Sequence, residues 1–405
     1  MEKETDEPET RRVDQAEAAL ARLGQCARAG RAPQRLWGSI RADALAGSNR
    51  PLPGHSSARH PATGRDAPGT HRDSPPTAPA PARPATQRPP AARSASPPAA
   101  PRVEKPAPTL QEYPIPAGSR PHDVAPAPGG AVWYTAQGAG ELGRLDPATG
   151  ETHHIKLGEG SAPHGVIVGP DGAPWITDGG LNVIVRVDPE TEAVQRFPLP
   201  GRSGPANLNT ATFDAAGVLW FTGQSGIYGR LDPAVGQVEL FEAPRGRGPY
   251  GITATPGGEV YYASLAGSYI ARIDTTTGAA TVIEPPTPGQ GARRIWSDSH
   301  GRLWVSEWNA GQLARYDPAT NEWREWPLPG DQPRPYAVYV DAHDMIWLSD
   351  FSANALARFD PAQEAFELFP LPSTPANVRQ LLGRPGEIWG AESGVDRLVV
   401  VKVEG

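Results

Sequence analysis

The chain has 405 residues, and its 48 Pro and 45 Gly are well above ordinary usage, which argues against a mostly helical protein. No run of about 18 apolar residues could cross a membrane as a helix, and the one cysteine, Cys26, excludes an internal disulfide or a cysteine metal cluster. The formal charge of −7 gives no indication of a nucleic-acid partner.

Residues 1–109 differ in composition from the rest of the chain. They carry 17 Lys and Arg against 11 Asp and Glu, and the stretch from Pro51 to Pro108 holds 16 prolines and no aromatic residue. Such a segment cannot bury enough apolar surface to offset the entropy lost on ordering, so we predict a disordered Ala/Arg/Pro-rich leader over 1–109. No apolar core follows Arg11 and Arg12, so an export signal is not expected. The compartment stays open: with this start we expect the cytoplasm, and a different start would allow export.

Residues 110–405 form a periodic region. Each unit has one aromatic anchor in a short β-rich motif such as VWYT, PWIT or LWVS. The anchors are Trp133, Trp175, Trp220, Tyr261, Trp304, Trp347 and Trp389, spaced 42, 45, 41, 43, 43 and 42 residues apart. Turn residues separate short strands inside each unit, and Asp-Pro pairs recur where a type I turn is expected. We therefore predict an all-β domain over 110–405, a seven-bladed β-propeller with four strands in each blade.

The ends of this region predict how the ring closes. Six units end with an outer strand such as RFPLP, whereas the seventh reaches Gly405 after three strands. A spare copy of the outer strand, EYPIP at 112–116, precedes the first unit. We expect it to pair with the last blade, which leaves no unpaired seam.

The anchor spacing also predicts which residues share one rim of the central channel. In each blade the start of the first strand and the end of the second strand lie at the same rim. The first-strand starts are His122, His164, Asn209, Tyr250, Arg293, Tyr336 and Arg379. The second-strand ends include Asp178, Glu307, Asp350 and Glu392, with Trp308 directly after Glu307.

Two interpretations of this polar rim remain open. Propeller channels are generally polar, so carboxylate–arginine pairs there can be purely structural. Alternatively, His122 and His164 on adjacent blades, with Asp178, supply a titratable base and a carboxylate. The acids Glu307, Asp350 and Glu392 either bind a polar ligand together with Arg293 and Arg379 or neutralise these arginines. Tyr250, Tyr336, Asn209 and Trp308 complete the expected substrate-binding set, and Trp308 could stack on a ligand.

The units RPHDVAPAPGGAVWYT, APHGVIVGPDGAPWIT and RLWVSEWNAGQLARYDP resemble the repeats of the virginiamycin B lyases, also called streptogramin B lyases. The resemblance covers about 110–405. It implies a monomeric seven-bladed propeller that uses Mg²⁺ to open type B streptogramins, small-molecule antibiotics, by elimination rather than hydrolysis. It implies neither a nucleic-acid nor a membrane partner.

The resemblance also implies roles for individual residues. The two Pro-His motifs of the family match His122 and His164 of this chain, which implies that His164 is the general base and His122 its partner. A base removes a proton next to a carbonyl while Mg²⁺ stabilises the enolate that develops. Of the two glutamates that bind the metal in the family, one is replaced by Ala162, and the other corresponds to Asp178, one residue out of register. Asp178 is therefore the expected Mg²⁺ ligand.

Three functions are compatible with these observations. The first is a virginiamycin B lyase-like enzyme acting on a type B streptogramin or a related lactone. The second is a propeller that binds a partner without catalysis, and the third is a metal-dependent lactonase that hydrolyses its substrate. The replaced glutamate favours a changed substrate or the second function, whereas the histidine pair favours the first.

Overall fold

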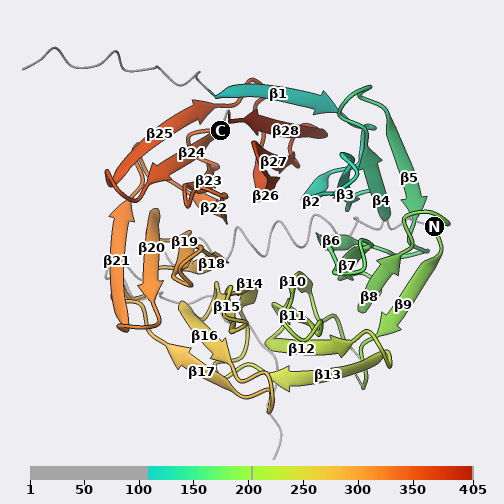
Figure 1. The fold of residues 1–405 in the computed structure, drawn as a ribbon, viewed down its shortest axis with the longest axis horizontal. Coiled ribbons are helices and arrows are strands. Elements are labelled where there is room, and N and C mark those ends of the chain that lie inside the picture. The colour runs from blue at the N-terminus through green and yellow to red at the C-terminus, as the bar shows by residue number, and fades with distance from the viewer. Residues whose placement is uncertain (1–107, 202–203, 404–405) are drawn as a thin grey trace, which may run out of the picture. The chain divides into compact units, whose positions relative to one another are not determined.

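The computed structural model describes residues 108–201 and 204–403, which contain 28 β-strands in seven four-stranded antiparallel sheets. The sheets are arranged as blades around a central channel (Figure 1). The predicted seven-bladed β-propeller is confirmed. The expected leader, residues 1–109, lies outside the described residues except for its last two. Among the residues described, no helix is long and apolar enough to cross a membrane.

The first strand of each blade lies nearest the channel (Figure 1). In chain order these strands are β2 (Pro121–Pro126), β6 (Pro163–Val168), β10 (Leu208–Phe213), β14 (Pro249–Ala254), β18 (Ala292–Ser297), β22 (Pro335–Val340) and β26 (Val378–Arg384). The second strands are β3 (Val132–Ala136), β7 (Pro174–Asp178), β11 (Leu219–Gly223), β15 (Val260–Ser264), β19 (Leu303–Glu307), β23 (Ile346–Asp350) and β27 (Glu387–Glu392).

The third and fourth strands complete each blade toward its outer edge. The third strands are β4 (Glu141–Leu145), β8 (Val183–Val187), β12 (Ile227–Asp232), β16 (Tyr269–Ile273), β20 (Gln312–Asp317), β24 (Ala355–Asp360) and β28 (Arg397–Lys402). The outer strands are β5 (Thr152–Lys156), β9 (Val194–Pro198), β13 (Gln237–Glu242), β17 (Ala280–Ile283), β21 (Glu322–Pro327), β25 (Ala365–Pro370) and, for the last blade, β1 (Thr109–Pro114). We number the blades 1 to 7 from β2 to β28.

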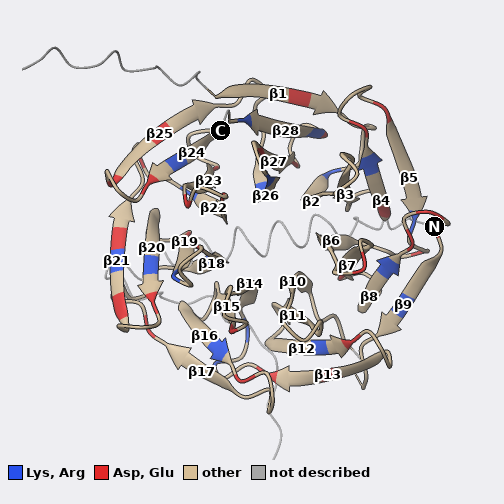
Figure 2. Cartoon of the chain, viewed as in Figure 1, with Lys and Arg blue, Asp and Glu red and all other residues tan. Residues whose placement is uncertain are grey.

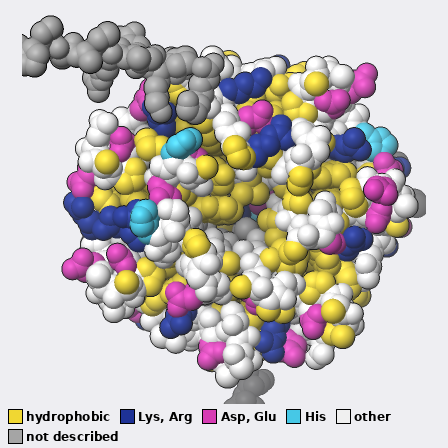
Figure 3. Space-filling view, viewed as in Figure 1, with side chains coloured by type: hydrophobic (Ala, Val, Ile, Leu, Met, Phe, Trp, Pro, Cys, Tyr) yellow, Lys and Arg dark blue, Asp and Glu magenta, His cyan; other side chains and the backbone are white. Residues whose placement is uncertain are grey.

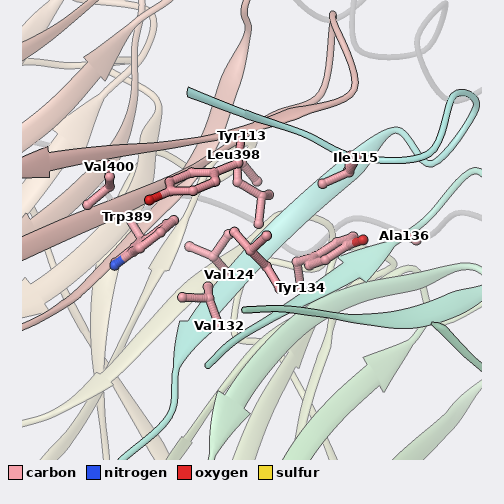
Figure 4. Close-up of a cluster of buried hydrophobic side chains, with 11 residues drawn as sticks. Tyr113, Ile115, Val124, Val132, Tyr134, Ala136, Trp389, Leu398 and Val400 are labelled. Carbon is pink, nitrogen blue, oxygen red and sulfur yellow. The ribbon is translucent and has the colours of Figure 1, made fainter. Parts of the chain in front are cut away.

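The ring closes as the sequence predicts, through a strand from the start of the domain. β1 pairs antiparallel with β28 over all six of its residues, from Thr109↔Lys402 to Pro114↔Arg397. The strand therefore begins three residues earlier than the expected segment 112–116. Tyr113 and Ile115 pack with Trp389 and with residues of blade 1 in one buried cluster (Figure 4). Because this cluster joins the last blade to the first, the ring has no open seam.

The aromatic anchors are explained by a contact that recurs from blade to blade. In six blades the anchor on the second strand lies directly opposite an arginine on the third strand, as in Trp220↔Arg230 and Trp304↔Arg315. The Arg230 guanidinium lies 5.5 Å from the Trp220 ring centroid, a cation–π distance. Figure 2 shows these arginines as blue bands on the third strands. The long side chains thus cover aromatic surface that would otherwise meet solvent.

Candidate functional site

Every first strand carries a β-bulge near its start, and this bulge shapes the channel. In blade 1, Pro121 pairs with Ala136, but the next aligned pair is Val124↔Tyr134. Five other blades show the same interruption of two residues, and in blade 2 one residue, His164, is skipped between Pro163↔Asp178 and Gly165↔Thr177. Because a bulge opposes two residues to one on the partner strand, consecutive side chains no longer alternate strictly between faces. In blades 1, 3 and 5 the second residue after the first position therefore also lies in the channel, where Asp123, Thr210 and Arg294 contact one another.

The two predicted catalytic histidines meet at this level. The rings of His122 and His164, from adjacent blades, have centroids 3.6 Å apart and are tilted by 38°. Both side chains are buried, with 2% and 8% of their surface exposed. The Thr135 hydroxyl donates to the His164 carbonyl at 2.8 Å and accepts from the Asp123 backbone N–H at 2.9 Å. This hydroxyl ties blade 1 to blade 2 and fixes the backbone beneath both histidines.

Asp123 orients His122 and also spans the channel. Its Oδ1 lies 2.8 Å from His122 Nδ1 and 2.9 Å from Nη2 of Arg294, which comes from blade 5. Arg294 Nη1 donates to the Thr210 hydroxyl of blade 3 at 2.5 Å. Asp123, Arg294 and Thr210 are all buried, so three blades are connected by a charged network in the floor of the site.

Sequence reasoning missed these three residues because it took one residue from each first strand. Asp123, Thr210 and Arg294 occupy the position after the predicted one, and the bulge brings that position into the channel. The tripeptide Pro-His-Asp and the dipeptide Arg-Arg were the available signals, but only the bulge shows that their last residue reaches the channel.

Arg293 and two tyrosines form the wall next to the histidines. The Arg293 guanidinium lies 3.6 Å from the Tyr336 ring centroid and 4.6 Å from that of Tyr250, and Nη2 donates to the Tyr250 hydroxyl at 3.0 Å. The Tyr250 and Tyr336 hydroxyls are hydrogen-bonded to each other. Tyr336 OH also lies 3.4 Å from His122 Nε2, and the Tyr250 ring meets the His164 ring edge-on at 6.0 Å. A polar chain therefore runs from the histidine pair to a cation held against aromatic faces.

Aromatic side chains from the loops after β19 and β23 extend this wall. The Trp308 ring lies 4.7 Å from the Arg293 guanidinium and meets Tyr336 edge-on at 5.8 Å. Phe351, which the sequence reasoning did not select, stacks on Tyr336 with ring centroids 4.9 Å apart. Arg379 lies 5.9 Å from the Tyr336 ring and donates from Nε to Ser393 Oγ at 2.8 Å. The structure thus brings Tyr250, Arg293, Trp308, Tyr336 and Arg379 together with both histidines.

Burial and positive charge both act on the titration of the histidines. Burial, followed by Arg379, Arg294 and Arg293, holds the pKa of His122 well below its usual value. Burial and then the neighbouring His122 lower the pKa of His164 in the same way. Both rings are therefore neutral near pH 7. The Asp123 carboxylate accepts the Nδ1 proton of His122, whereas Nδ1 of His164 has no hydrogen-bond partner among the described residues.

Two of the predicted carboxylates serve the loops of their own rim. Asp178 Oδ1 accepts the backbone N–H groups of Ala162, Gly180 and Leu181, each at 3.0 Å, and its Oδ2 accepts the Ser161 hydroxyl at 2.5 Å. Asp350 likewise accepts backbone N–H groups at 2.8 and 2.9 Å from the loops that flank it. Asp178 and Asp350 therefore stabilise the loops of this rim by accepting hydrogen bonds from their backbone N–H groups.

The remaining predicted polar residues make contacts away from the histidine pair. Glu307 accepts from Gln312 on the third strand of its own blade at 2.6 Å, and burial raises the pKa of Glu307 to about 8. Burial and the nearby Glu112 carboxylate of β1 raise the pKa of Glu392 to about 8. Asn209 donates to the Asn207 carbonyl at 3.1 Å, and its buried Oδ1 has no partner among the described residues. Glu307 therefore contacts the third strand of its own blade, and Glu392 lies near the outer strand β1 of its own blade.

The donors at the expected metal position do not fit Mg²⁺. This hard cation takes oxygen ligands, but Ala162 offers no side-chain oxygen and Asp178 uses both of its oxygens for the loop. His122, Asp123 and His164 do have ligand atoms within 4.8 Å of one another, yet two of the three are imidazoles, and Arg294 already pairs with the carboxylate. Mg²⁺ stays a prediction without support from these side chains.

A separate surface hollow lies between blades 4 and 5. It measures about 790 Å³ and is lined by turn residues together with Glu259, Arg272 and His300. Glu259 and Arg272 pair with each other at 2.7 Å. Figure 3 shows one face of the molecule, on which charged side chains are spread around the circumference and hydrophobic ones gather nearer the centre. The hollow has neither histidine of the pair, so it is not the candidate site.

The fold recurs in solved structures of several kinds. Virginiamycin B lyase from Staphylococcus aureus matches with a TM-score of 0.68 and 22% identity over 74% of this chain and 100% of that chain. A catalytically inactive histidine-to-alanine variant of that lyase, in a structure with quinupristin, gives the same values. YCF48 bound to D1 peptide matches with a TM-score of 0.59 and 16% identity over 73% of this chain and 97% of that chain. At these identities the similarity shows the fold alone.

Family assignment rests on the sequence. No curated protein matches it. The model of the virginiamycin B lyase family, however, matches residues 102–321, which is more than half of the chain and includes both histidine motifs. The chain therefore belongs to the virginiamycin B lyase family.

Proposed function

We propose that this protein opens a cyclic ester by elimination, with a type B streptogramin or a related lactone as its substrate. One observation carries the proposal. Two histidines whose pKa values are both lowered meet ring against ring, and Nδ1 of one of them, His164, is buried and has no hydrogen-bond partner among the described residues, so its lone pair is not engaged there. Family membership and the quinupristin structure of the inactive lyase variant support this choice of substrate.

In the proposed reaction His164 is the general base. It removes the proton from a carbon that lies next to a carbonyl and is bonded to the carbon bearing the ester oxygen. The electron pair of the C–H bond forms a second bond between the deprotonated carbon and the carbon that bears the ester oxygen. The bond from the latter carbon to the ester oxygen breaks, and the ester group leaves as a carboxylate. No water is consumed, so the product is an isomer of the substrate. Since the pKa of His164 is lowered, the base is unprotonated at neutral pH without help from another group.

The partner histidine has a different role in this proposal. Its Nδ1–H donates to Asp123, which fixes the tautomer with Nε2 directed at the Tyr336 hydroxyl. His122 therefore holds the polar chain of the site in place beside the base. Its close ring contact with His164 also disfavours a second positive charge there, which helps to keep His164 neutral.

A non-catalytic binding role is the second candidate. It is favoured by the poor fit of the expected metal ligands, and propellers of this fold include YCF48, which was solved with a bound peptide. A metal-dependent lactonase receives no support from these donors.

The test is turnover of quinupristin and a panel of lactones, followed by mass spectrometry. The wild-type protein is expected to give a linear product of unchanged mass. His164→Ala should lose at least about 10²-fold in rate, the usual contribution of a general base. His153→Ala is the matched control because that side chain is 57% exposed on an outer strand, and it should retain activity. Absence of any turnover by the wild-type protein would reject the enzyme in favour of the binding role.

A further inference from the structure

Five of the seven blades are joined to the next blade by the same contact, which we call the hydroxyl bridge. The next-to-last residue of the second strand is a buried Thr or Ser, and its hydroxyl donates to a first-strand carbonyl of the following blade. The same hydroxyl accepts a first-strand N–H of its own blade, so it ties two inner strands together. The bridging residues are Thr135, Thr177, Thr222, Ser306 and Ser349.

Blades 4 and 7 have alanine at this position. In blade 7 it is Ala391, and there another side chain takes over, because Gln380 of the same blade accepts the Val124 backbone N–H of blade 1 at 3.0 Å. The closing cluster adds apolar packing between the same two blades. In blade 4 the residue is Ala263, which has no hydroxyl to donate to β18 of blade 5.

Contacts of other kinds join blades 4 and 5. Ala263 lies in a buried apolar cluster that both blades form. Two hydrogen bonds cross this interface at the rim of the site: the Gly291 N–H donates to Ser268 Oγ at 3.2 Å, and Arg293 Nη2 donates to the Tyr250 hydroxyl at 3.0 Å. One of them comes from a loop and the other from a long side chain. Apolar packing, which is not directional, therefore takes the place of the hydroxyl bridge between the inner strands.

The turns on the other side of the ring show the same difference. Blade 3 is joined to blade 4 there by Arg230 Nη1, which donates to the Thr275 carbonyl at 2.8 Å. Blade 5 is joined to blade 6 by Ser299 Oγ, which donates to the Asp344 carboxylate at 2.6 Å. Between blades 4 and 5 this side holds the surface hollow of about 790 Å³. The interface is thus less tightly joined at both of its ends than the interfaces that flank it.

Local opening of a folded protein begins where the fewest contacts must break. We propose that the ring opens transiently between blades 4 and 5, more often than at the two neighbouring interfaces. The wall of the channel site spans this interface, since Tyr250 belongs to blade 4 whereas Arg293 and Trp308 belong to blade 5. Opening therefore widens the site on this side. The proposal is independent of the proposed function, because the movement is measured without substrate.

The labelling rate of a buried thiol measures such opening, because the thiol reacts only while its interface is open. The third strands offer a matched series of fully buried alanines, one at each interface: Ala271 between blades 3 and 4, Ala314 between blades 4 and 5, and Ala357 between blades 5 and 6. Each is replaced by Cys in a full chain that carries Cys26→Ser, and reaction with Ellman's reagent is followed in native buffer. Ala314→Cys should react at least about 10-fold faster than the other two, the equivalent of one to two missing hydrogen bonds.

Two further variants test whether the missing hydroxyl is the cause. Ala263→Ser, added to Ala314→Cys, supplies a hydroxyl at the bridging position and should slow labelling by about 5-fold, the net effect of one hydrogen bond. Thr222→Ala, added to Ala271→Cys, removes the bridge between blades 3 and 4 and should accelerate labelling by at least the same factor. Thermal melts followed by circular dichroism establish that each variant is folded. If a third-strand variant unfolds, Ala263→Cys and Ala391→Cys form a second pair at equivalent buried positions, and Ala263→Cys should react faster.

The outcomes are distinct. Equal rates for the three third-strand thiols, or the fastest rate at either flanking interface, would overturn the proposal. A folded Ala263→Ser variant that labels as fast as its parent would overturn it as well. Absence of ester opening by the wild-type protein would reject the proposed function and leave the labelling result unaffected.

Discussion

The buried ion pair between Asp123 and Arg294 offers a quantitative test of the channel floor. The pair has a 2.9 Å contact and side chains that are 2% and 5% exposed. Asp123→Asn preserves shape but leaves the Arg294 cation buried without a counter-charge, a change that costs about 3–5 kcal/mol of unfolding free energy. Arg294→Met leaves the carboxylate alone, at a similar cost. In the double variant Asp123→Asn/Arg294→Met neither charge remains, and we expect a loss of only about 1–2 kcal/mol.

The assay is differential scanning calorimetry of the four proteins at pH 7. Each single variant should lower Tm by about 6–15 °C, and the double variant should recover most of that loss. The expected coupling energy is therefore at least about 4 kcal/mol in favour of the pair. Single losses that simply add in the double variant would refute the reasoning, because they would mean that the two side chains do not compensate each other's charge.

Three further results follow from the structure. Glu307→Gln should be more stable than the wild type at pH 9 by about 2–4 kcal/mol but not at pH 5. Burial raises the pKa of Glu307 in the folded protein from 4.5 to about 8, so the stabilisation from this group is present below pH 4.5 and is lost as the pH rises to 8. Equal Tm differences between the two proteins at both pH values would contradict this. Tyr113→Ala should lower the free energy of unfolding by about 3–5 kcal/mol, because the Tyr113 ring stacks on Trp389 in the closing cluster. Tyr113→Phe loses only the hydroxyl and should lower it by about 1 kcal/mol. Similar denaturant midpoints for the two variants would argue against closure by this contact. The rate of ester opening should stay level from pH 8 to pH 6 and fall only at lower pH, because the pKa of His164 lies well below 6.5, and a midpoint at 6.5 would indicate an unperturbed base.

The architecture could be predicted from the sequence because each blade is a local unit. Anchors such as Trp220 recur at a regular spacing, and six of the seven face an arginine on the next strand of the same blade. The closing strand could also be inferred, since a copy of the outer strand stood before the first unit. Its pairing was predicted correctly, but the strand covers 109–114 rather than 112–116, so it begins three residues earlier and ends two residues earlier.

The site was only partly predictable, for a geometric reason. The anchor spacing selects one residue at each first-strand start, and on that basis His122 and His164 were placed on adjacent blades, where the structure brings their rings together. The bulge adds the following position, so Asp123 and Arg294 were missed. Aspartates such as Asp178 were expected to face the site, but backbone N–H groups of the rim loops need acceptors, and the carboxylate satisfies them.

The central claim is that His164 opens an ester by removing a proton from carbon, and oxygen labelling tests it most directly. The wild-type protein is incubated with quinupristin in ¹⁸O-labelled water, and the mass of the linear product is measured by mass spectrometry. Elimination predicts a product with the mass of the substrate and no labelled oxygen, formed at a rate that His164→Ala strongly reduces. A product carrying one labelled oxygen, or a rate unchanged in His164→Ala, would contradict the account.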